Sequence, residues 1–254
     1  MGTIITVYYV LIFFIFVVPF GLFMMYVIRK STEKKSPAFL ALEKYEMTQK
    51  VNELKQKIRP WKQLSINTIT NSTLHSYKRW TSRIATGRIQ DSSYEPVVAF
   101  KQIERGLYTE GHIVASTTAF DLYFVYTRTE NTIYYDGQLL GVIAKNGTVY
   151  NANTTAIGKT NRVTNRNDPD YGHYSVFLND RYVAEINKSS DLKAFKRNIL
   201  HDPHNKTFGK PFIYTGPKQV YELVKAADDI TEEELKWVNA IGIFECILFS
   251  IDIY

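Results

Sequence analysis

Residues 133–150 read IYYDGQLLGVIAKNGTVY and contain two strong hairpin signals. Asp136-Gly137 and Asn146-Gly147 each separate short runs that are rich in Tyr, Ile and Val. Asp-Gly and Asn-Gly favour type I′ turns, because both central residues of that turn take positive φ. The stretch therefore predicts three short antiparallel strands joined by two-residue turns.

The same plan extends on both sides of this stretch. Asn179-Asp180 separates the strand-like runs 174–178 and 181–186, and Glu110-Gly111 marks a fourth predicted turn. Tight turns at this density, with Tyr, Val, Ile and Thr between them, indicate an antiparallel sheet that curls into a barrel or a sandwich. We expect this β domain to occupy residues 97–254.

The C-terminal segment breaks the β pattern. Thr231 and Glu234 have the spacing of a capping box at the start of a helix. Residues 237–254 read WVNAIGIFECILFSIDIY and are apolar on nearly every helical face. Such a helix is buried in a protein core or in a bilayer. The run is short for a membrane span and contains Glu245, which is costly at mid-bilayer. We therefore predict a helix enclosed by the sheet, with these core residues: Trp237, Ile241, Phe244, Leu248 and Ile251.

Antiparallel hairpins followed by a nearly all-apolar C-terminal helix resemble the tubby C-terminal-like superfamily, which includes tubby proteins, phospholipid scramblases and LURP-one-related proteins. The resemblance covers residues 97–254 and is carried by these segments: 140–143, 156–159, 174–177, 183–188 and 240–253. It implies a closed β-barrel threaded by the C-terminal helix. Scrambling activity is not implied, since the segment lacks the acidic calcium-loop motif of the scramblases. Phosphoinositide binding through basic residues is also in doubt, because residues 97–254 hold 17 Lys/Arg and 19 Asp/Glu.

The N-terminus predicts a membrane anchor. Residues 2–28 read GTIITVYYVLIFFIFVVPFGLFMMYVI and contain no charged residue and no His. About 20 apolar residues suffice to cross the ~30 Å hydrocarbon core. A cleaved signal peptide would have a basic start, a core of about 7–15 residues and a small-residue cleavage site. This run has none of these, and it predicts a retained single-pass helix within residues 1–30.

Basic residues follow the anchor directly. They are Arg29, Lys30, Lys34 and Lys35, and no basic residue precedes the apolar run. The positive-inside rule then places the N-terminus outside and residues 29–254 in the cytoplasm, with these four side chains near anionic lipid headgroups. The sequons at Asn146 and Asn153 leave the opposite topology open. The single cysteine, Cys246, cannot form an internal disulfide and agrees with a cytoplasmic domain.

Residues 31–96 are predicted to form a basic juxtamembrane helix followed by a linker. Residues 29–96 hold 14 Lys/Arg against 6 Asp/Glu. A helix is predicted over 38–59, with an apolar stripe that suits a partner protein, self-pairing or the distal domain. The stripe consists of Leu40, Met47, Val51, Leu54 and Ile58. Residues 61–96 are rich in Ser, Thr and Asn and are interpreted as irregular structure or linker.

Candidate chemical groups do not assemble into a recognised site. His201 and His204 lack the further ligands of a zinc site, and the segment 168–172 lacks the later ligands of a calcium loop. Cys246 is interpreted as a small core residue. Glu245 on the apolar helix requires either a partner or a raised pKa, and a structural role is predicted for it.

The leading hypothesis from the sequence is a non-enzymatic, membrane-anchored interaction or sensing module without cofactor or metal, which presents a tubby-like barrel at the cytoplasmic face. A second hypothesis is a phospholipid-binding or lipid-moving protein. A third is an extracytoplasmic binding domain with the opposite topology. Nucleic-acid binding is not favoured, because the basic and aromatic mixture of residues 77–88 is unspecific and lies close to a predicted membrane tether.

Overall fold

The structure is a computed structural model of the chain, and it describes residues 18–23, 25, 36–79, 82–105, 110–161, 173–188 and 222–251. The chain divides into two compact units, Met1–Glu46 and Met47–Tyr254. The second unit contains every strand of the described part, together with the C-terminal helix.

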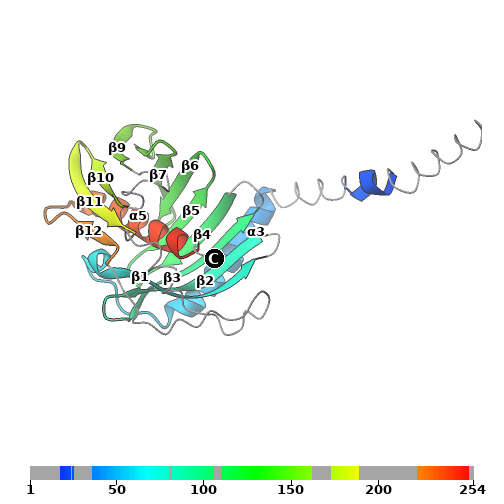
Figure 1. Cartoon of the computed structure of the whole chain (residues 1–254), viewed down its shortest axis with the longest axis horizontal. Coiled ribbons are helices and arrows are strands. Elements are labelled where there is room, and N and C mark those ends of the chain that lie inside the picture. The colour runs from blue at the N-terminus through cyan, green and yellow to red at the C-terminus, as the bar shows by residue number, and fades with distance from the viewer. Residues whose placement is uncertain are drawn as a thin grey trace, which may run out of the picture. The chain divides into compact units, whose positions relative to one another are not determined.

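The strands of the second unit form one antiparallel sheet of 12 strands that curls into a nearly closed barrel (Figure 1). Each strand pairs with the next one in the chain. Near the seam, the Leu223 N–H donates to the Ile69 carbonyl at 2.9 Å, and a single bridge joins Thr70 to Glu222. The strands are β1 (Ile69–Arg79), β2 (Ser82–Asp91), β3 (Pro96–Arg105), β4 (Glu110–Ser116), β5 (Asp121–Tyr126), β6 (Glu130–Tyr135), β7 (Gln138–Ala144), β8 (Thr148–Asn151), β9 (Ala156–Thr160), β10 (His173–Leu178), β11 (Arg181–Asn187) and β12 (Val224–Ala226).

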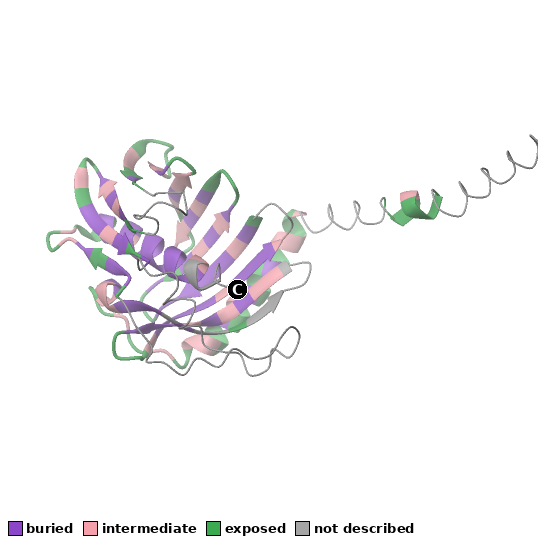
Figure 2. Cartoon of the chain, viewed as in Figure 1, coloured by how far each residue is buried: buried purple, intermediate pink, exposed green. Residues whose placement is uncertain are grey.

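The C-terminal helix α5 (Glu232–Ile251) packs against the concave side of the sheet (Figure 1, Figure 2). Its start is the predicted capping box. The Thr231 N–H donates to Glu234 Oε2 at 2.9 Å, and the Glu234 N–H donates to Thr231 Oγ1 at 3.3 Å. Val238, Ile243 and Ile247 are fully buried in one cluster with inward side chains of the strands. The barrel interior is therefore filled by its own helix.

Helix α3 (Pro37–Lys55) is close to the predicted range of 38–59. It ends at Lys55, five residues before Pro60, and the chain continues through turns. Its residues Met47 and Val51 belong to the same compact unit as the barrel and are fully buried. They form a second apolar cluster with Ala99 and Val114 on β3 and β4, and Leu54 packs against it. Met47, Val51 and Leu54 therefore pack against the distal domain, which was one of the three predicted alternatives. A protein partner for the helix stays a prediction.

The interpretation of residues 61–96 as a linker is wrong for most of that stretch. It contains the 3₁₀ helix η2 (Ser65–Thr68) and the whole of β1 and β2. The alternation of large apolar residues is hidden here for two reasons. The inward positions of β2 include the small residues Ala85 and Gly87, and the β1–β2 register shifts between Ile69 and Thr73. The barrel consequently begins at β1 and not at residue 97.

Two of the four predicted hairpin turns are confirmed. Asp136-Gly137 and Asn179-Asp180 have positive φ at both positions, as a type I′ turn requires. The other two differ. β7 ends at Ala144, so the loop has three residues, and of them only Gly147 has positive φ, at 86°. This is the three-residue hairpin that ends in a left-handed residue. Glu110-Gly111 lies within β4, where the two residues pair with Arg105 and Glu104 of β3.

The predicted anchor at residues 2–28 falls mostly outside the described residues. Its described parts, residues 18–23 and 25, are helical. Within the described ranges, no helix has the length and apolar character that a membrane crossing needs.

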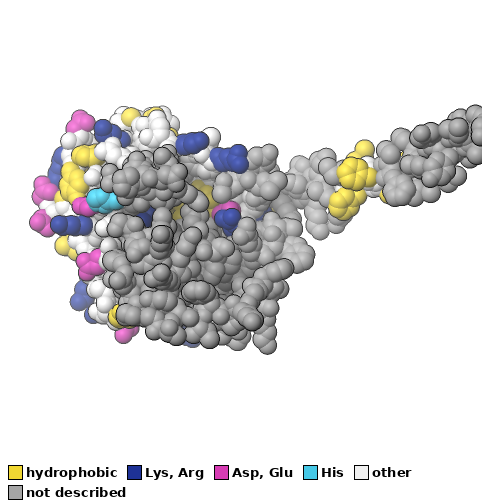
Figure 3. Space-filling model, in the orientation of Figure 1, with side chains coloured by type: hydrophobic (Ala, Val, Ile, Leu, Met, Phe, Trp, Pro, Cys, Tyr) yellow, Lys and Arg dark blue, Asp and Glu magenta, His cyan; other side chains and the backbone are white. Residues whose placement is uncertain are grey.

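The start of the barrel at residue 69 separates a basic segment from a neutral one. Residues 29–68 hold 10 Lys/Arg and 4 Asp/Glu, whereas residues 69–254 hold 21 of each. The net charge of +6 therefore precedes the barrel, and the barrel segment is neutral. On the face seen in Figure 3, cationic and anionic side chains are interspersed over the part that is coloured.

Candidate functional site at the barrel mouth

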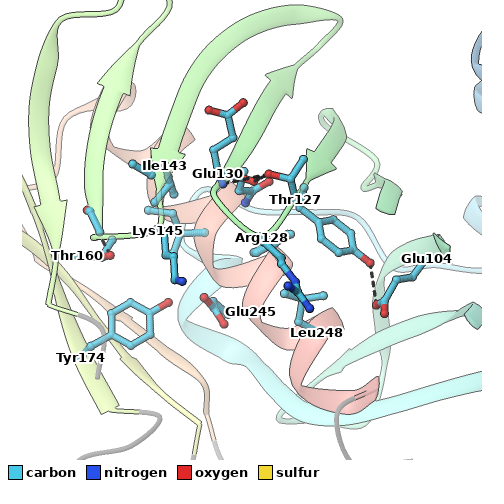
Figure 4. A pocket seen from close by; sticks show the side chains of 16 residues that line it. Glu104, Thr127, Arg128, Glu130, Ile143, Lys145, Thr160, Tyr174, Glu245 and Leu248 are labelled. Atoms are coloured by element: carbon cyan, nitrogen blue, oxygen red, sulfur yellow. Dashed lines mark hydrogen bonds between the residues drawn. The ribbon is translucent and has the colours of Figure 1, made fainter. Parts of the chain in front are cut away.

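A cavity of about 270 Å³ lies at one end of the barrel, where the ends of several strands meet the C-terminal half of α5 (Figure 4). We call this end the barrel mouth. Its lining comes from β3, β5, β6, β7, β9, β10 and α5, and from the β5–β6 and β7–β8 loops. The lining residues are Glu104, Tyr126, Thr127, Arg128, Glu130, Asn131, Ile143, Ala144, Lys145, Gly147, Thr160, Tyr174, Ile241, Phe244, Glu245 and Leu248.

One backbone hydrogen bond joins the two loops at the mouth, and further hydrogen bonds hold each loop. The Lys145 N–H donates to the Thr129 carbonyl at 2.7 Å, which joins the β7–β8 loop to the β5–β6 loop. Within the first loop, Thr127 Oγ1 accepts the Glu130 N–H at 3.2 Å. In the second, the Gly147 carbonyl accepts the Thr160 N–H at 2.7 Å. Loops tied in this way present their side chains at a fixed spacing.

The floor of the cavity is one face of α5. Ile241, Phe244, Glu245 and Leu248 follow the spacing i, i+3, i+4 and i+7, which places them on one side of a helix. The Phe244 ring packs against Phe124, with a centroid distance of 5.1 Å. Three of the four floor residues are apolar, so the floor can take an apolar part of a ligand.

A buried hydrogen-bond chain lies beside the cavity. Gln102 Nε2 donates to Tyr126 Oη at 2.6 Å, and Tyr126 Oη donates to Glu104 Oε2 at 3.2 Å. Arg83 Nη1 lies 3.5 Å from the other oxygen of Glu104. Burial, reinforced by the Glu104 charge, raises the pKa of Tyr126 above its usual range, so the phenol stays protonated. Gly111 makes room for this phenol, because a Cβ there would lie 2.4 Å from Tyr126 Oη.

Glu245 forms a buried ion pair with Lys188, which follows directly after β11. The two side chains are only 5% and 9% exposed. The sequence required either a partner or a raised pKa for Glu245, and the structure shows a partner, Lys188. The next residue, Cys246, is fully buried, and its thiol donates to the Thr70 carbonyl at 3.3 Å. Burial raises the pKa of Cys246 to about 12. A thiol kept protonated in this way is a poor nucleophile.

Polar groups at the mouth include an amide without a complete set of partners. Asn131 is 8% exposed and lines the cavity. Its Oδ1 atom is buried and has no hydrogen-bond partner among the described residues. Such an atom in a cavity wall points to a bound water or ligand group. In Figure 4, the side chains of Arg128 and Lys145 point toward Glu245, whereas Glu130 points the opposite way.

The structure describes only some of the residues that the sequence analysis singled out. Trp237, Ile241 and Phe244 are buried in the main core, and Leu248 is partly buried and lines the cavity. Ile251 is the last residue of α5, and its side chain is outside the described part. Arg29, Lys30, Lys34, Lys35, His201, His204 and the segment 168–172 also lie outside it. No group of three or more His, Cys, Asp or Glu suited to a metal ion occurs among the described residues.

Sequence reasoning missed most of the mouth. Tyr126 and Arg128 lie in the β5–β6 hairpin and Lys188 follows β11, and no local pattern sets them apart from other polar residues. Lys145 could have been found from the sequence, because it is the first residue of the turn that ends at Gly147. Only the register of the strands brings these residues to one end of the barrel.

Comparisons with protein-family models, with curated proteins and with solved structures find no match to this chain.

Proposed function

We propose that the chain is a membrane-anchored, non-enzymatic binding module whose barrel mouth takes a small ligand. The observation that supports this most directly is the cavity itself. The interior of the barrel is filled by α5, yet a space of about 270 Å³ remains where the helix reaches the mouth. Ligand sites commonly measure about 300–1,000 Å³ and combine an apolar lining with a few placed polar groups. The mouth has this composition, and its volume lies just below that size range.

The membrane part of the proposal comes from the sequence. An uncharged run of 27 residues is followed by Arg29, Lys30, Lys34 and Lys35, which favours a single-pass anchor with the barrel on the cytoplasmic side. The barrel with its C-terminal helix also supports, without identifying, the resemblance to the tubby-like superfamily. A binding module on a tether would sample ligands close to the membrane surface.

Photo-crosslinking tests the binding function. The full chain is reconstituted in phosphatidylcholine nanodiscs with a neutral dodecyl alcohol that carries a diazirine, and labelled peptides are mapped by mass spectrometry. We expect labelling of α5 between Ile241 and Leu248. Leu248→Trp should fill the cavity and reduce this labelling about tenfold or more. Leu139→Trp, at an exposed position of β7, is the matched control and should leave it unchanged.

Protection of Cys246 from a thiol reagent shows that each variant is folded, since it is the only cysteine of the chain and is buried. If α5 remains unlabelled in the folded wild-type chain, or if Leu248→Trp is labelled as strongly as wild type, the binding function is wrong.

Anchoring and topology need separate tests. Phe13→Arg combined with Phe16→Arg should release the chain from alkali-washed membranes, because each Arg at the centre of a span costs about 2.5–3.5 kcal/mol. Asn153→Cys introduces an exposed thiol in the β8–β9 turn. An impermeant reagent should label it only after the membrane is opened. Labelling from outside intact cells would overturn the cytoplasmic placement.

A further inference from the structure

Each of the two buried carboxylates that line the cavity has a cation beside it. Arg83 Nη1 lies 3.5 Å from Glu104 Oε1, and Lys188 forms the buried ion pair with Glu245. A charge that already has its partner gains little from a second ion, whereas that ion would lose its hydration on entering the cavity. These two carboxylates therefore give a charged ligand little to bind.

The other charged side chains of the lining are directed in the same sense. Arg128 and Lys145 point toward the Glu245 carboxylate, whereas Glu130 is exposed and points the opposite way (Figure 4). Cations that face a carboxylate are already attracted to it. A ligand head that carries no charge avoids this compensated set and enters the cavity at the lowest cost of hydration.

Strand register turns Asn131 toward the inside of the barrel. Ile133, two positions along β6, is fully buried in the main core, and residues i and i+2 of a strand share a face. Asn131 pairs with Tyr126 of β5 and with Ile143 of β7, and all three residues line the cavity. Asn131 is 8% exposed, so its amide lies in the inner wall and not on the outer surface.

The amide oxygen of Asn131 is a buried acceptor that needs a donor. Its Oδ1 atom has no hydrogen-bond partner among the described residues. The hydroxyl of Tyr126 does not serve it, because that hydroxyl donates to Glu104 and accepts from Gln102. A buried carbonyl oxygen without a donor is costly, and a group that supplies a hydrogen atom removes the cost. The cavity therefore offers a neutral acceptor on its wall.

The floor beside this acceptor is apolar, and the Phe244 ring packs against Tyr126 with a centroid distance of 5.8 Å. From this arrangement we propose that the barrel mouth binds an uncharged single-chain amphiphile, whose hydroxyl or amide head donates a hydrogen bond to Asn131 Oδ1 and whose alkyl chain lies along Phe244 and Leu248. The inference rests on the proposed function and adds the chemical class of the ligand. A cavity of about 270 Å³ suits one chain end with a small head, and it is small for a lipid with two chains.

The test uses five photoreactive probes that share a diazirine-bearing dodecyl chain and differ in the head. Two heads, a hydroxyl and a primary amide, are uncharged donors. A methyl ether is uncharged but has no hydrogen atom to donate, and a carboxylate and an amine carry charge. Each probe is cross-linked to the full chain in phosphatidylcholine nanodiscs, and labelling of α5 is compared at equal probe density.

We expect the alcohol or the primary amide to label α5 about three- to tenfold more than the ether, as for one hydrogen bond between neutral groups. The stronger of the two identifies the head. The carboxylate and the amine should label α5 less than the alcohol does, because each would lose its hydration without gaining a free countercharge.

Asn131→Leu removes the acceptor and keeps about the same side-chain volume. This variant should be labelled equally by the alcohol, the amide and the ether. Its stability should not fall, since the substitution also removes a buried polar atom without a partner among the described residues. Thr132→Val is the matched control, because it removes a hydroxyl from the next residue of β6, on the outward face and outside the cavity lining. It should leave the preference for the alcohol unchanged.

Equal labelling of the wild-type chain by the ether and the two donors would overturn the donated hydrogen bond and leave the Asn131 oxygen to a water. Stronger labelling by the carboxylate or the amine would overturn the uncharged head. A preference for the donors that survives Asn131→Leu would overturn the role of Asn131. In these three cases the cavity remains a binding site, whereas failure of every probe to label α5 would remove the proposed function itself. The wild-type comparison needs no variant, so it decides even where Cys246 labelling shows that Asn131→Leu is unfolded.

Discussion

The packed interior of the barrel and the barrel mouth are built from the same helix but follow different rules. In the interior, Val238, Ile243 and Ile247 of α5 are fully buried among apolar strand residues. At the mouth, the helix buries Glu245 against Lys188, and the neighbouring strands bury Tyr126 with Glu104. Apolar burial alone explains the interior, at about 25 cal/mol for each Å² of apolar surface removed from water.

The mouth cannot be explained in the same way. A buried ion pair is often no more stabilising than apolar side chains of equal volume, because both charges lose their hydration. Four buried polar residues line the cavity: Glu104, Asn131, Thr160 and Glu245. We propose that the interior specifies the barrel, whereas the mouth serves the proposed ligand. Variants of the interior and of the mouth should therefore differ in stability.

The largest effect is expected in the interior. Ile243→Asp places a carboxylate where Ile243 is fully buried, and nothing in the apolar cluster can pair with it. The cost should exceed about 5 kcal/mol, which is comparable with the whole stability of many domains. We expect loss of the β signal in circular dichroism and rapid labelling of Cys246. Ile243→Val, the matched control, should cost about 1 kcal/mol and keep the fold. A folded Ile243→Asp variant would contradict the packed interior.

The ion pair at the mouth should give the next largest effect. Lys188→Met leaves the Glu245 carboxylate buried without its partner, which typically costs about 3–5 kcal/mol. Adding Glu245→Leu removes the stranded charge, so the double variant should regain most of that loss. Denaturant unfolding of the full chain followed by tryptophan fluorescence measures both. If the single variant is as stable as wild type, the pair is hydrated and the contrast with the interior weakens.

Tyr126→Phe should have a smaller effect. It removes the hydroxyl that accepts from Gln102 and donates to Glu104, and leaves these two buried groups with one partner fewer. The expected loss is about 1–3 kcal/mol. Tyr94→Phe is the control, because the Tyr94 side chain is half exposed and its variant should lie within about 0.5 kcal/mol of wild type. Equal effects from the two variants would mean that the buried hydrogen bonds of Tyr126 contribute no more to stability than the hydroxyl of a surface tyrosine.

The sequence was informative where local chemistry decides the structure. Asp136-Gly137 and Asn179-Asp180 specify type I′ turns through their own backbone preferences, and Thr231 with Glu234 specifies the start of α5. The nearly all-round apolar character of residues 237–254 likewise indicated a helix within a sheet. These features depend on few residues and on no distant contact, which is why an antiparallel sheet with a C-terminal helix could be predicted from them. They left a barrel and a sandwich open, and only the resemblance implied the barrel.

The sequence was uninformative where tertiary contacts decide. β2 places Ala85 and Gly87 on its inward face, so its strand pattern has few large apolar residues. Glu245 looked exceptional on an apolar helix, but its partner Lys188 lies 57 positions earlier in the chain. The pairing of the mouth loops depends on the Lys145–Thr129 hydrogen bond, which follows from strand register and not from either loop sequence. A candidate site assembled in this way is visible only once the sheet is closed.

The last effect appears only above pH 9, and it separates two neighbouring residues of α5, Glu245 at the mouth and Cys246 in the interior. Burial raises the pKa of Cys246 from 9.0 to about 12. Above pH 9 the unfolded chain therefore releases the thiol proton while the folded chain keeps it. This contribution to stability is complete below pH 9, and it falls by about 1.4 kcal/mol per pH unit as the pH rises toward 12.

Cys246→Ala removes the titrating group but leaves every tyrosine in place. Its stability should differ from that of wild type by a constant amount below pH 9, and the difference should shift in favour of the variant between pH 9 and pH 11. Denaturant unfolding followed by tryptophan fluorescence at pH 8, 10 and 11 measures this shift. Parallel pH profiles for the two chains would mean that the thiol is hydrated. The face of α5 that holds Cys246 would then belong to the hydrated mouth and not to the packed interior.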